Sequence, residues 1–167
     1  MSLLRLLIAS SCLLAAAPIG LVQAQEPSVT GQTGLISMPD GRVAADGTWR
    51  TGLSLLRPYE AIWSSVSLLP WIETSARYTR IFQVPTDFSP AQGTGYGDYK
   101  DKSFDVKLRL FDESESRPSL ALGAQDFFGT EIFGGYYLAG SKRFGDLDFT
   151  LGYGARRFDG AFGGVRY

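Results

Sequence analysis

The sequence predicts an all-β protein whose antiparallel strands form an up-and-down meander. Apolar residues recur at every second position through most of the chain, which is the period of a strand with two different faces. No segment after residue 24 carries apolar residues at helical spacing. Proline and glycine-aspartate turn signals separate the apolar runs at regular intervals.

The first 24 residues have the layout of a secretory signal peptide. Arg5 supplies a positive charge, residues 6–17 form an apolar run, and the small-residue site VQA ends at Ala24. The run falls short of the ~20 apolar residues that a transmembrane helix needs. We therefore expect Sec-type export with cleavage about after Ala24.

Cys12 is the only cysteine of the chain. It follows Ala9-Ser10-Ser11, which resembles a lipoprotein cleavage box, although apolar residues continue beyond it. Lipidation at Cys12 and an ordinary cysteine within the signal both stay open. Cleavage after Ala24 would leave no disulfide or thiol chemistry in the mature chain.

Composition excludes several classes of function. The 16 Lys+Arg and 17 Asp+Glu become 15 and 17 once Arg5 is removed, a net charge of -2, which offers no basic footprint for nucleic acid. The absence of histidine excludes Ser-His and Cys-His catalysis and the usual zinc and haem ligation within this chain. We expect no cofactor.

The mature chain divides into a loop-rich lead-in, residues 25–47, and a strand region, residues 48–167. Glycines and Pro39 surround a short apolar pair in the lead-in, which we expect to tuck against or inside the strands. The strand-like runs cover residues 48–56, 61–69, 72–82, 103–111, 119–128, 135–143, 146–154 and 161–167.

The connections between the runs alternate in length, as in an outer-membrane barrel with short periplasmic turns and longer outer loops. Tight turns at Pro70 and Gly145-Asp146 fall at one end together with residues 112–118. The long connection 83–102 falls at the other end. The region 48–167 is therefore typical of an outer-membrane β-barrel, or of the N-terminal part of one.

The same alternation also suits a soluble β-sandwich, whose apolar face points inward. Aromatic residues near the run ends favour the barrel, because aromatic girdles lie at membrane interfaces. Those residues are Trp49, Tyr59, Trp63, Trp71, Tyr78, Tyr136, Tyr137, Tyr153 and Tyr167. The alternative is that they are ordinary core or edge aromatics of a secreted or periplasmic carbohydrate-binding sandwich.

The junction of the long connection with the following strand is the candidate polysaccharide contact. Carboxylates hydrogen-bond sugar hydroxyls and tyrosine rings stack on sugars; the alternative is a solvated loop with compensated charge. The candidate residues are Tyr96, Asp98, Tyr99, Lys107 and Arg109. The stretch lacks the ligand spacing of an EF-hand, so no metal site is predicted.

Charged residues on the polar sides of strands predict either a wet lumen for an anionic polymer or ion pairs that plug a narrow lumen, and we favour the pairs. The cations are Arg77, Lys107, Arg109, Lys142 and Arg143, and the anions are Glu73, Asp105 and Asp148. A glycosidase would need two carboxylates flanking one bond. Glu73 and Asp126 are the candidates, but nothing in the sequence fixes their separation, so we predict that the protein is not an enzyme.

Six blocks of the chain, in order, resemble the start of the YjbH-type exopolysaccharide biosynthesis proteins. They are TGLISMPDGRVAADGTWRTG, WSSVSLLPWIETSARYTRI, YGDYKDKSFDVKLRL, LALGAQDFFGT, SKRFGDLDFTLGYG and DGAFGGVRY. The resemblance implies an exported outer-membrane β-barrel that takes part in exopolysaccharide biosynthesis or export, in contact with outer-membrane lipid, polysaccharide, and the lipoprotein and periplasmic partners of the same system. It transfers no catalytic site. Members of the family run several times longer, so we expect DGAFGGVRY to be an interior strand of a larger barrel.

Overall fold

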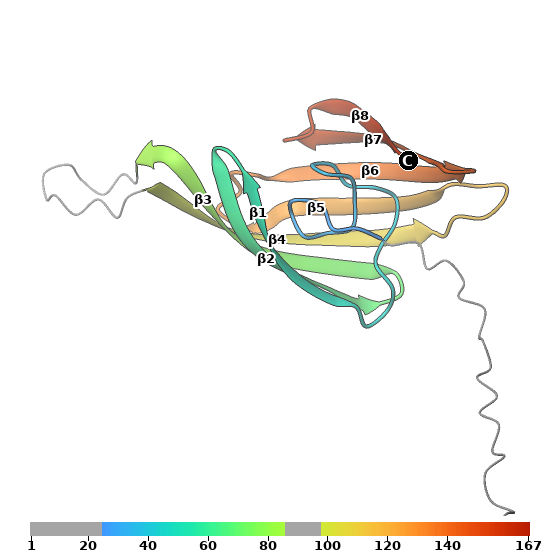
Figure 1. Ribbon diagram of the computed structural model, residues 1–167, viewed down its shortest axis with the longest axis horizontal. Helices are drawn as coiled ribbons and strands as arrows, with labels where there is room; N and C mark the ends of the chain where they lie inside the picture. Colours follow the sequence, from blue (N-terminus) through green and yellow to red (C-terminus); the bar gives the residue numbers. More distant parts are fainter. Residues whose placement is uncertain (1–24, 86–97) are drawn as a thin grey trace, which may run out of the picture.

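The computed structural model describes residues 25–85 and 98–167. The predicted signal peptide, with Cys12, and the candidate contact Tyr96 lie outside the described residues. Figure 1 shows a single curved sheet with the lead-in running across one of its faces. No helix in the described ranges is long and apolar enough to cross a membrane.

Eight strands form the sheet, and each pairs antiparallel with its neighbours in the sequence. The predicted all-β antiparallel meander is thereby confirmed. In the part of the chain that the structure describes, β1 and β8 are the two edge strands and do not pair with each other. The strands are β1 (Trp49–Leu56), β2 (Tyr59–Leu69), β3 (Ile72–Pro85), β4 (Asp98–Phe111), β5 (Ser119–Gly129), β6 (Gly135–Phe144), β7 (Leu147–Arg156) and β8 (Gly160–Arg166).

The connection between β3 and β4 is shorter than the sequence predicts. The expected loop 83–102 is wrong at both ends, because β3 continues to Pro85 and β4 begins at Asp98. The added pairs are polar: Arg80 lies opposite Lys100, and its guanidinium binds Asp98 at 2.7 Å. The start of β4 has no alternation of apolar and polar residues, so the sequence did not predict it. Contacts between charged residues of β3 and β4 hold this part of the sheet together.

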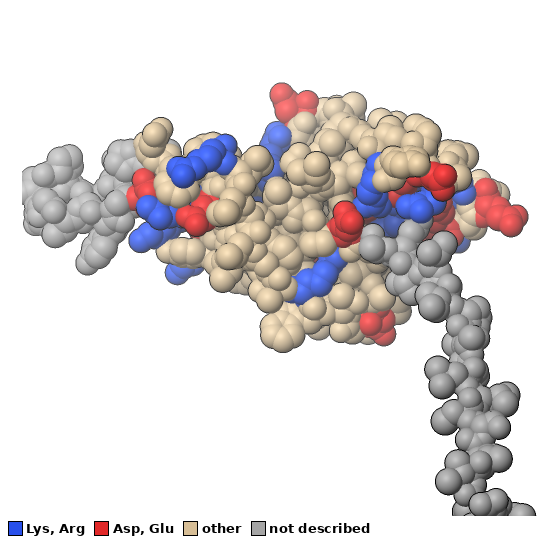
Figure 2. All heavy atoms as spheres, in the orientation of Figure 1, with Lys and Arg blue, Asp and Glu red and all other residues tan. Residues whose placement is uncertain are grey.

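The two faces of the sheet have the reverse polarity of a soluble sandwich. Along β4, the side chains on the face that carries the lead-in are buried and polar: Asp101, Ser103, Asp105 and Lys107. Along β7, Asp148 and Thr150 are buried, whereas Leu151 on the other face is 71% exposed. Figure 2 shows charged groups gathered mainly toward the two ends of the visible face, with largely uncharged surface between them. The apolar side chains therefore point away from the buried face.

Three large aromatic residues on the buried face lie over glycines of the neighbouring strand. Trp63 is paired with Gly52, Tyr137 with Gly123, and Phe162 with Gly152. A Cβ at Gly52 would lie 2.5 Å from the Trp63 ring, and Cβ atoms at the other two glycines would meet the Tyr137 and Phe162 rings as closely. Aromatic rings that cover cross-strand glycines fill space and fix the register of the strands.

These contacts correct the prediction that Trp63 and Tyr137 belong to interfacial girdles. Both residues are buried. The Trp63 ring lies against Gly31 of the lead-in and its indole N–H donates to Ser54 Oγ at 2.8 Å, whereas the Tyr137 ring packs against Phe158 and Phe162. Their positions on β2 and β6 have the same parity as the buried polar residues, and only the sheet register shows that glycines leave room for them. The exposed residues Trp49 and Tyr153 lie on the apolar face.

The substitution Gly123→Ala should lower the free energy of unfolding by about 1–3 kcal/mol, because the added methyl group overlaps the buried Tyr137 ring. Gly140→Ala is the matched control, since its Cβ would meet nothing closer than 3.6 Å. That change should stay within about 0.5 kcal/mol of the parent protein. Chemical denaturation followed by tryptophan fluorescence measures both, and equal effects would contradict the proposed ring-over-glycine packing.

Candidate functional site

The lead-in, residues 25–47, lies against the polar face of the sheet and reaches from one edge strand to the other. At β1, Ser54 Oγ donates to the carbonyl of Val29 at 2.8 Å. At β8, the Leu35 side chain packs directly over Gly164. Between these edges the segment meets the sheet through three buried charged residues, each of which joins it to different strands.

Glu73 of β3 is the first of these residues. Its carboxylate is completely buried and accepts hydrogen bonds from the Thr33 N–H at 2.8 Å and the Thr33 hydroxyl at 3.1 Å. It also accepts from the Ala44 N–H at 3.4 Å and forms an ion pair with Arg50 of β1. The carboxylate thus holds the lead-in at two points and ties it to β1 and β3.

Lys107 of β4 is the second. Its ammonium group is fully buried and donates to the Thr33 carbonyl, to the Arg42 carbonyl at 2.9 Å and to Asp40 Oδ1 at 3.2 Å. A buried ammonium is stable only when it is paired and hydrogen-bonded. Lys107 therefore depends on the lead-in for all three of these contacts, including its counter-charge.

Arg42 of the lead-in is the third. Its guanidinium binds Asp148 of β7 with two bonds, at 2.8 and 2.9 Å, and Glu113 of the β4–β5 connection at 2.5 Å. Asp148 also accepts from Arg166 of β8 at 2.7 Å. Burial opposes the charged form of Arg42, but these two carboxylates outweigh it and raise the pKa of the guanidinium. The cluster clamps the lead-in to the end of the sheet with the β2–β3 and β6–β7 turns.

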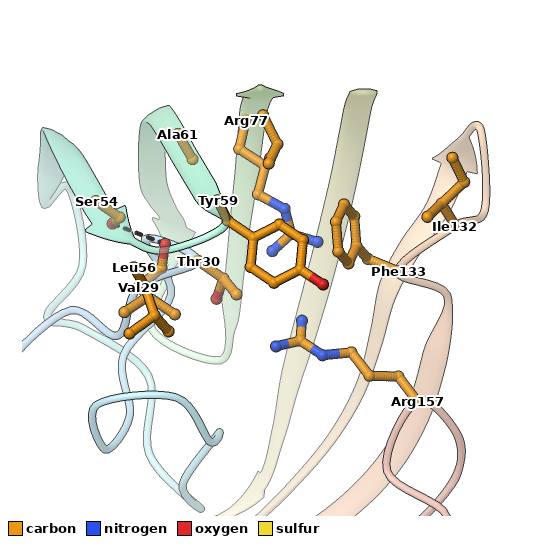
Figure 3. Close-up of a pocket in the computed structure, with 11 residues that line it drawn as sticks. Val29, Thr30, Ser54, Leu56, Tyr59, Ala61, Arg77, Ile132, Phe133 and Arg157 are labelled. Atoms are coloured by element: carbon orange, nitrogen blue, oxygen red, sulfur yellow. Dashed lines mark hydrogen bonds between the residues drawn. The ribbon is translucent and has the colours of Figure 1, made fainter. Parts of the chain in front are cut away.

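A pocket of about 330 Å³ opens at the opposite end of the sheet, beside the β1–β2, β5–β6 and β7–β8 connections. Figure 3 shows the guanidinium group of Arg77, from β3, and that of Arg157, from the β7–β8 connection, beside the rings of Tyr59 and Phe133. Arg77 binds Asp105 at 3.1 Å and Ser103 at 3.2 Å. The pocket thus combines aromatic walls with two cations.

The structure does not bring the predicted polysaccharide contacts into one site. Asp98 and Tyr99 begin β4, and Asp98 binds Arg80 and accepts from the Gln83 N–H at 3.1 Å. Lys107 lies nine residues further along β4, which corresponds to about 30 Å of strand, and Arg109 pairs with Asp112 at 2.7 Å near the other end. A polysaccharide contact at these residues stays a prediction.

The predicted plugging ion pairs form in part between strands and in part with the lead-in. Arg77 and Asp105 pair across β3 and β4, as expected for cross-strand charges. Lys107 instead pairs with Asp40, and Asp148 with Arg42, both from the lead-in. The hypothetical glycosidase carboxylates are engaged elsewhere: Glu73 binds the lead-in, and Asp126 accepts the Phe133 N–H at 2.9 Å.

Several important residues carried no signal in the sequence. Asp40, Arg42 and Arg50 lie in or next to a loop-rich segment without periodicity, so nothing indicated their partners. The pocket residues Tyr59 and Arg157 lie almost a hundred positions apart and meet only because the meander brings alternate connections to one end. The one available signal was the presence of Arg157 in a connection between two apolar runs.

Comparison with known proteins gives one family and one curated relative. The family model YjbH, described as exopolysaccharide biosynthesis protein YbjH, matches residues 27–166. The uncharacterized lipoprotein YjbH of Escherichia coli (strain K12) is 40% identical over 157 residues, covering 92% of this chain. The chain spans 22% of the length of that relative. No solved structure matches.

Replacing Glu73 with alanine should release the lead-in, because Arg50 would lose its buried partner and Thr33 its acceptor. Removing one member of a buried ion pair destabilises by about 3–5 kcal/mol. The measurement is the rate of tryptic cleavage after Arg42, which is buried in the parent protein. Glu60→Ala is the control, since Glu60 forms only an exposed pair with Arg80 at 3.8 Å. If both variants resist trypsin as the parent does, Glu73 does not anchor the lead-in.

The Arg42 cluster also predicts a pH dependence. Burial acts to raise the pKa of Glu113, but the Arg143 N–H and the Arg42 guanidinium outweigh it and lower that pKa below its usual value. The stabilisation by ionised Glu113 should be complete above the unfolded pKa of about 4.3 and disappear as the pH falls through the lower folded value. Parent and Glu113→Gln unfolding free energies should therefore differ at neutral pH and converge in acid. Glu115→Gln, at an exposed position of the same connection, is the control. A gap that persists in strong acid would refute this assignment.

Proposed function

Because the chain belongs to the YjbH family of exopolysaccharide biosynthesis proteins, we propose that it forms part of an outer-membrane β-barrel that acts without catalysis in producing or exporting an extracellular polysaccharide. The chain corresponds to about a fifth of its curated relative, so the activity, substrate and partners of the whole protein are all part of this proposal. Its partners would be outer-membrane lipid, the polysaccharide, and lipoprotein and periplasmic components of the same system.

The reversed polarity of the sheet is the observation that carries the proposal. A soluble sheet buries its apolar face and exposes its polar face, whereas a membrane barrel presents apolar side chains to lipid. Here Leu53 and Leu151 on opposite margins of the sheet are 72% and 71% exposed, while Glu73 and Lys107 are completely buried. Exposing such an apolar face to water is unfavourable, and a lipid bilayer removes that penalty.

Strand length and aromatic placement support the same proposal. Strands β2 to β7 have 10 to 14 residues, and a tilted transmembrane strand needs about 9–11. Exposed aromatic side chains at strand ends, such as Trp49, Phe128 and Phe144, suit the interfaces of a bilayer. The predicted signal peptide and the lipoprotein name of the relative both agree with a place in the cell envelope.

The non-enzymatic role is supported by what the buried charges already do. Glu73 binds the lead-in and Arg50, and Asp105 binds Arg77, so these groups are engaged in holding the structure together. A component that shapes a passage or a docking surface for a polymer needs only this fixed, charge-lined interior.

The substitution Leu151→Arg tests the lipid-facing assignment. Leu151 lies in the middle of β7 on the apolar face, so arginine there should cost about 2–4 kcal/mol in a bilayer and should abolish recovery in the outer-membrane fraction. Ala155→Arg, at the exposed end of β7, is the control and should cost about 1 kcal/mol or less. Fractionation of cells expressing the exported chain measures the outcome.

The competing function is a secreted or periplasmic carbohydrate-binding β-sandwich. For such a protein an exposed Leu→Arg change would stay within about 0.5 kcal/mol and the chain would be recovered without detergent. A parent protein that is a stable soluble monomer, or a Leu151→Arg variant that behaves as Ala155→Arg does, would therefore overturn the membrane proposal.

A further inference from the structure

The pocket at the end of the sheet with the β1–β2, β5–β6 and β7–β8 connections has a one-sided charge. Its lining contains two arginines and neither aspartate nor glutamate. Asp105 binds Arg77 but is not one of the residues that line the pocket. Two cations therefore face the cavity, and the carboxylates of Asp105 and Asp126 lie behind the lining, close enough to interact with Arg77.

Arg77 offers the pocket a hydrogen-bond donor that the protein does not use. The residue is more than nine-tenths buried, and its Nε and Nη1 donate to Ser103 and Asp105. Its Nη2 is buried and has no acceptor among the described residues. A buried guanidinium N–H without an acceptor is unfavourable, and an oxygen ligand in the cavity would relieve this.

The guanidinium of Arg157 lacks a directly bound carboxylate among the described residues. Its contact with a polar side chain is a bond to the neutral Gln125 at 3.1 Å, and no carboxylate of residues 25–85 or 98–167 forms an ion pair with it. Burial and the positive charge of Arg77 lower the pKa of the Arg157 guanidinium, and the nearby Asp105 carboxylate offsets them only in part. Both guanidinium carbons lie near the Phe133 ring, at 5.7 and 6.0 Å from its centroid. An anion between the two cations would stabilise both.

The remaining walls suit a sugar. Tyr59 and Phe133 form an edge-to-face pair with centroids 5.4 Å apart, and Figure 3 shows the Tyr59 hydroxyl directed toward Arg157. The volume of about 330 Å³ lies within the range of pockets that hold small ligands. Guanidinium groups bind carboxylates through paired N–H donors, and aromatic rings cover the apolar face of a pyranose.

We infer that this pocket binds the carboxylate of an acidic sugar residue, a hexuronate unit of a polysaccharide, between Arg77 and Arg157. The choice of a saccharide as ligand rests on the proposed function, whereas the choice of an anion rests on the two arginines alone. The pocket would hold one acidic unit of the polymer at the end of the sheet where the lead-in leaves room. Specificity for acidic over neutral polymer would follow from the two guanidinium groups that face the cavity.

Isothermal titration of the purified full chain in detergent with trigalacturonate, maltotriose and inorganic phosphate tests this inference. Trigalacturonate should bind, and Arg157→Gln should weaken it at least tenfold, because half of the cationic pair is lost. Arg156→Gln is the matched control: its side chain is exposed and pairs with Glu131 at 3.0 Å, so it should bind as the parent does. Arg157→Lys keeps the positive charge but loses the paired N–H donors of the guanidinium group, and should bind trigalacturonate with intermediate affinity.

Three results would overturn the inference: equal binding of maltotriose, binding of phosphate as tight as that of trigalacturonate, or unchanged binding by Arg157→Gln. Thermal unfolding shows whether that variant is folded; if it is not, the loss of affinity must appear in Arg157→Lys. The proposed function is judged separately by fractionation. A chain that is recovered in the outer membrane but does not bind trigalacturonate refutes only the proposed ligand of the pocket. A chain that is soluble and binds trigalacturonate refutes only the membrane proposal.

Discussion

The structure depends on pairing the charged side chains that are buried on the polar face of the sheet. Glu73, Lys107 and Asp148 point inward from three different strands, where each would be strongly unfavourable without a partner. The lead-in supplies those partners: Thr33 for Glu73, Asp40 for Lys107 and Arg42 for Asp148. The segment therefore takes the place that an apolar core occupies in a soluble β-protein.

This arrangement links the interior to the proposed role in the membrane. Because the polar side chains are matched inside, the apolar side chains are left to face outward, where lipid is the favourable environment. The two ends of the interior differ in how their cations are paired. Around Arg42, four cations share the carboxylates of Glu113 and Asp148. At the other end Arg77 binds Asp105, whereas Arg157 forms no ion pair with a carboxylate of residues 25–85 or 98–167. The second end is accordingly the one where a ligand adds most.

Sequence patterns located the strands well and their partners poorly. The run SFDVKLRLF was recognisable because Phe104 and Val106 alternate with polar residues, and it forms β4 from residue 103 to its end. The beginning of the same strand was missed, since Asp98 and Lys100 give no apolar period and are held by contacts with β3. Trp63 was placed at an interface because it lies near the end of its apolar run, but Gly52 on the neighbouring strand leaves room for it on the buried face.

The sequence alone determined the all-β class, the family and the sets of residues that share a face, because a strand alternates its side chains whatever surrounds it. It could not determine which face is buried, since a period of two is the same for a soluble sheet and for a lipid-facing one. It also could not assign the buried hydrogen bonds and ion pairs, which join residues 40 positions apart at Thr33–Glu73 and 106 apart at Arg42–Asp148. Tertiary structure decided both, because only the register of eight strands and the path of the lead-in across them bring these charges within bonding distance.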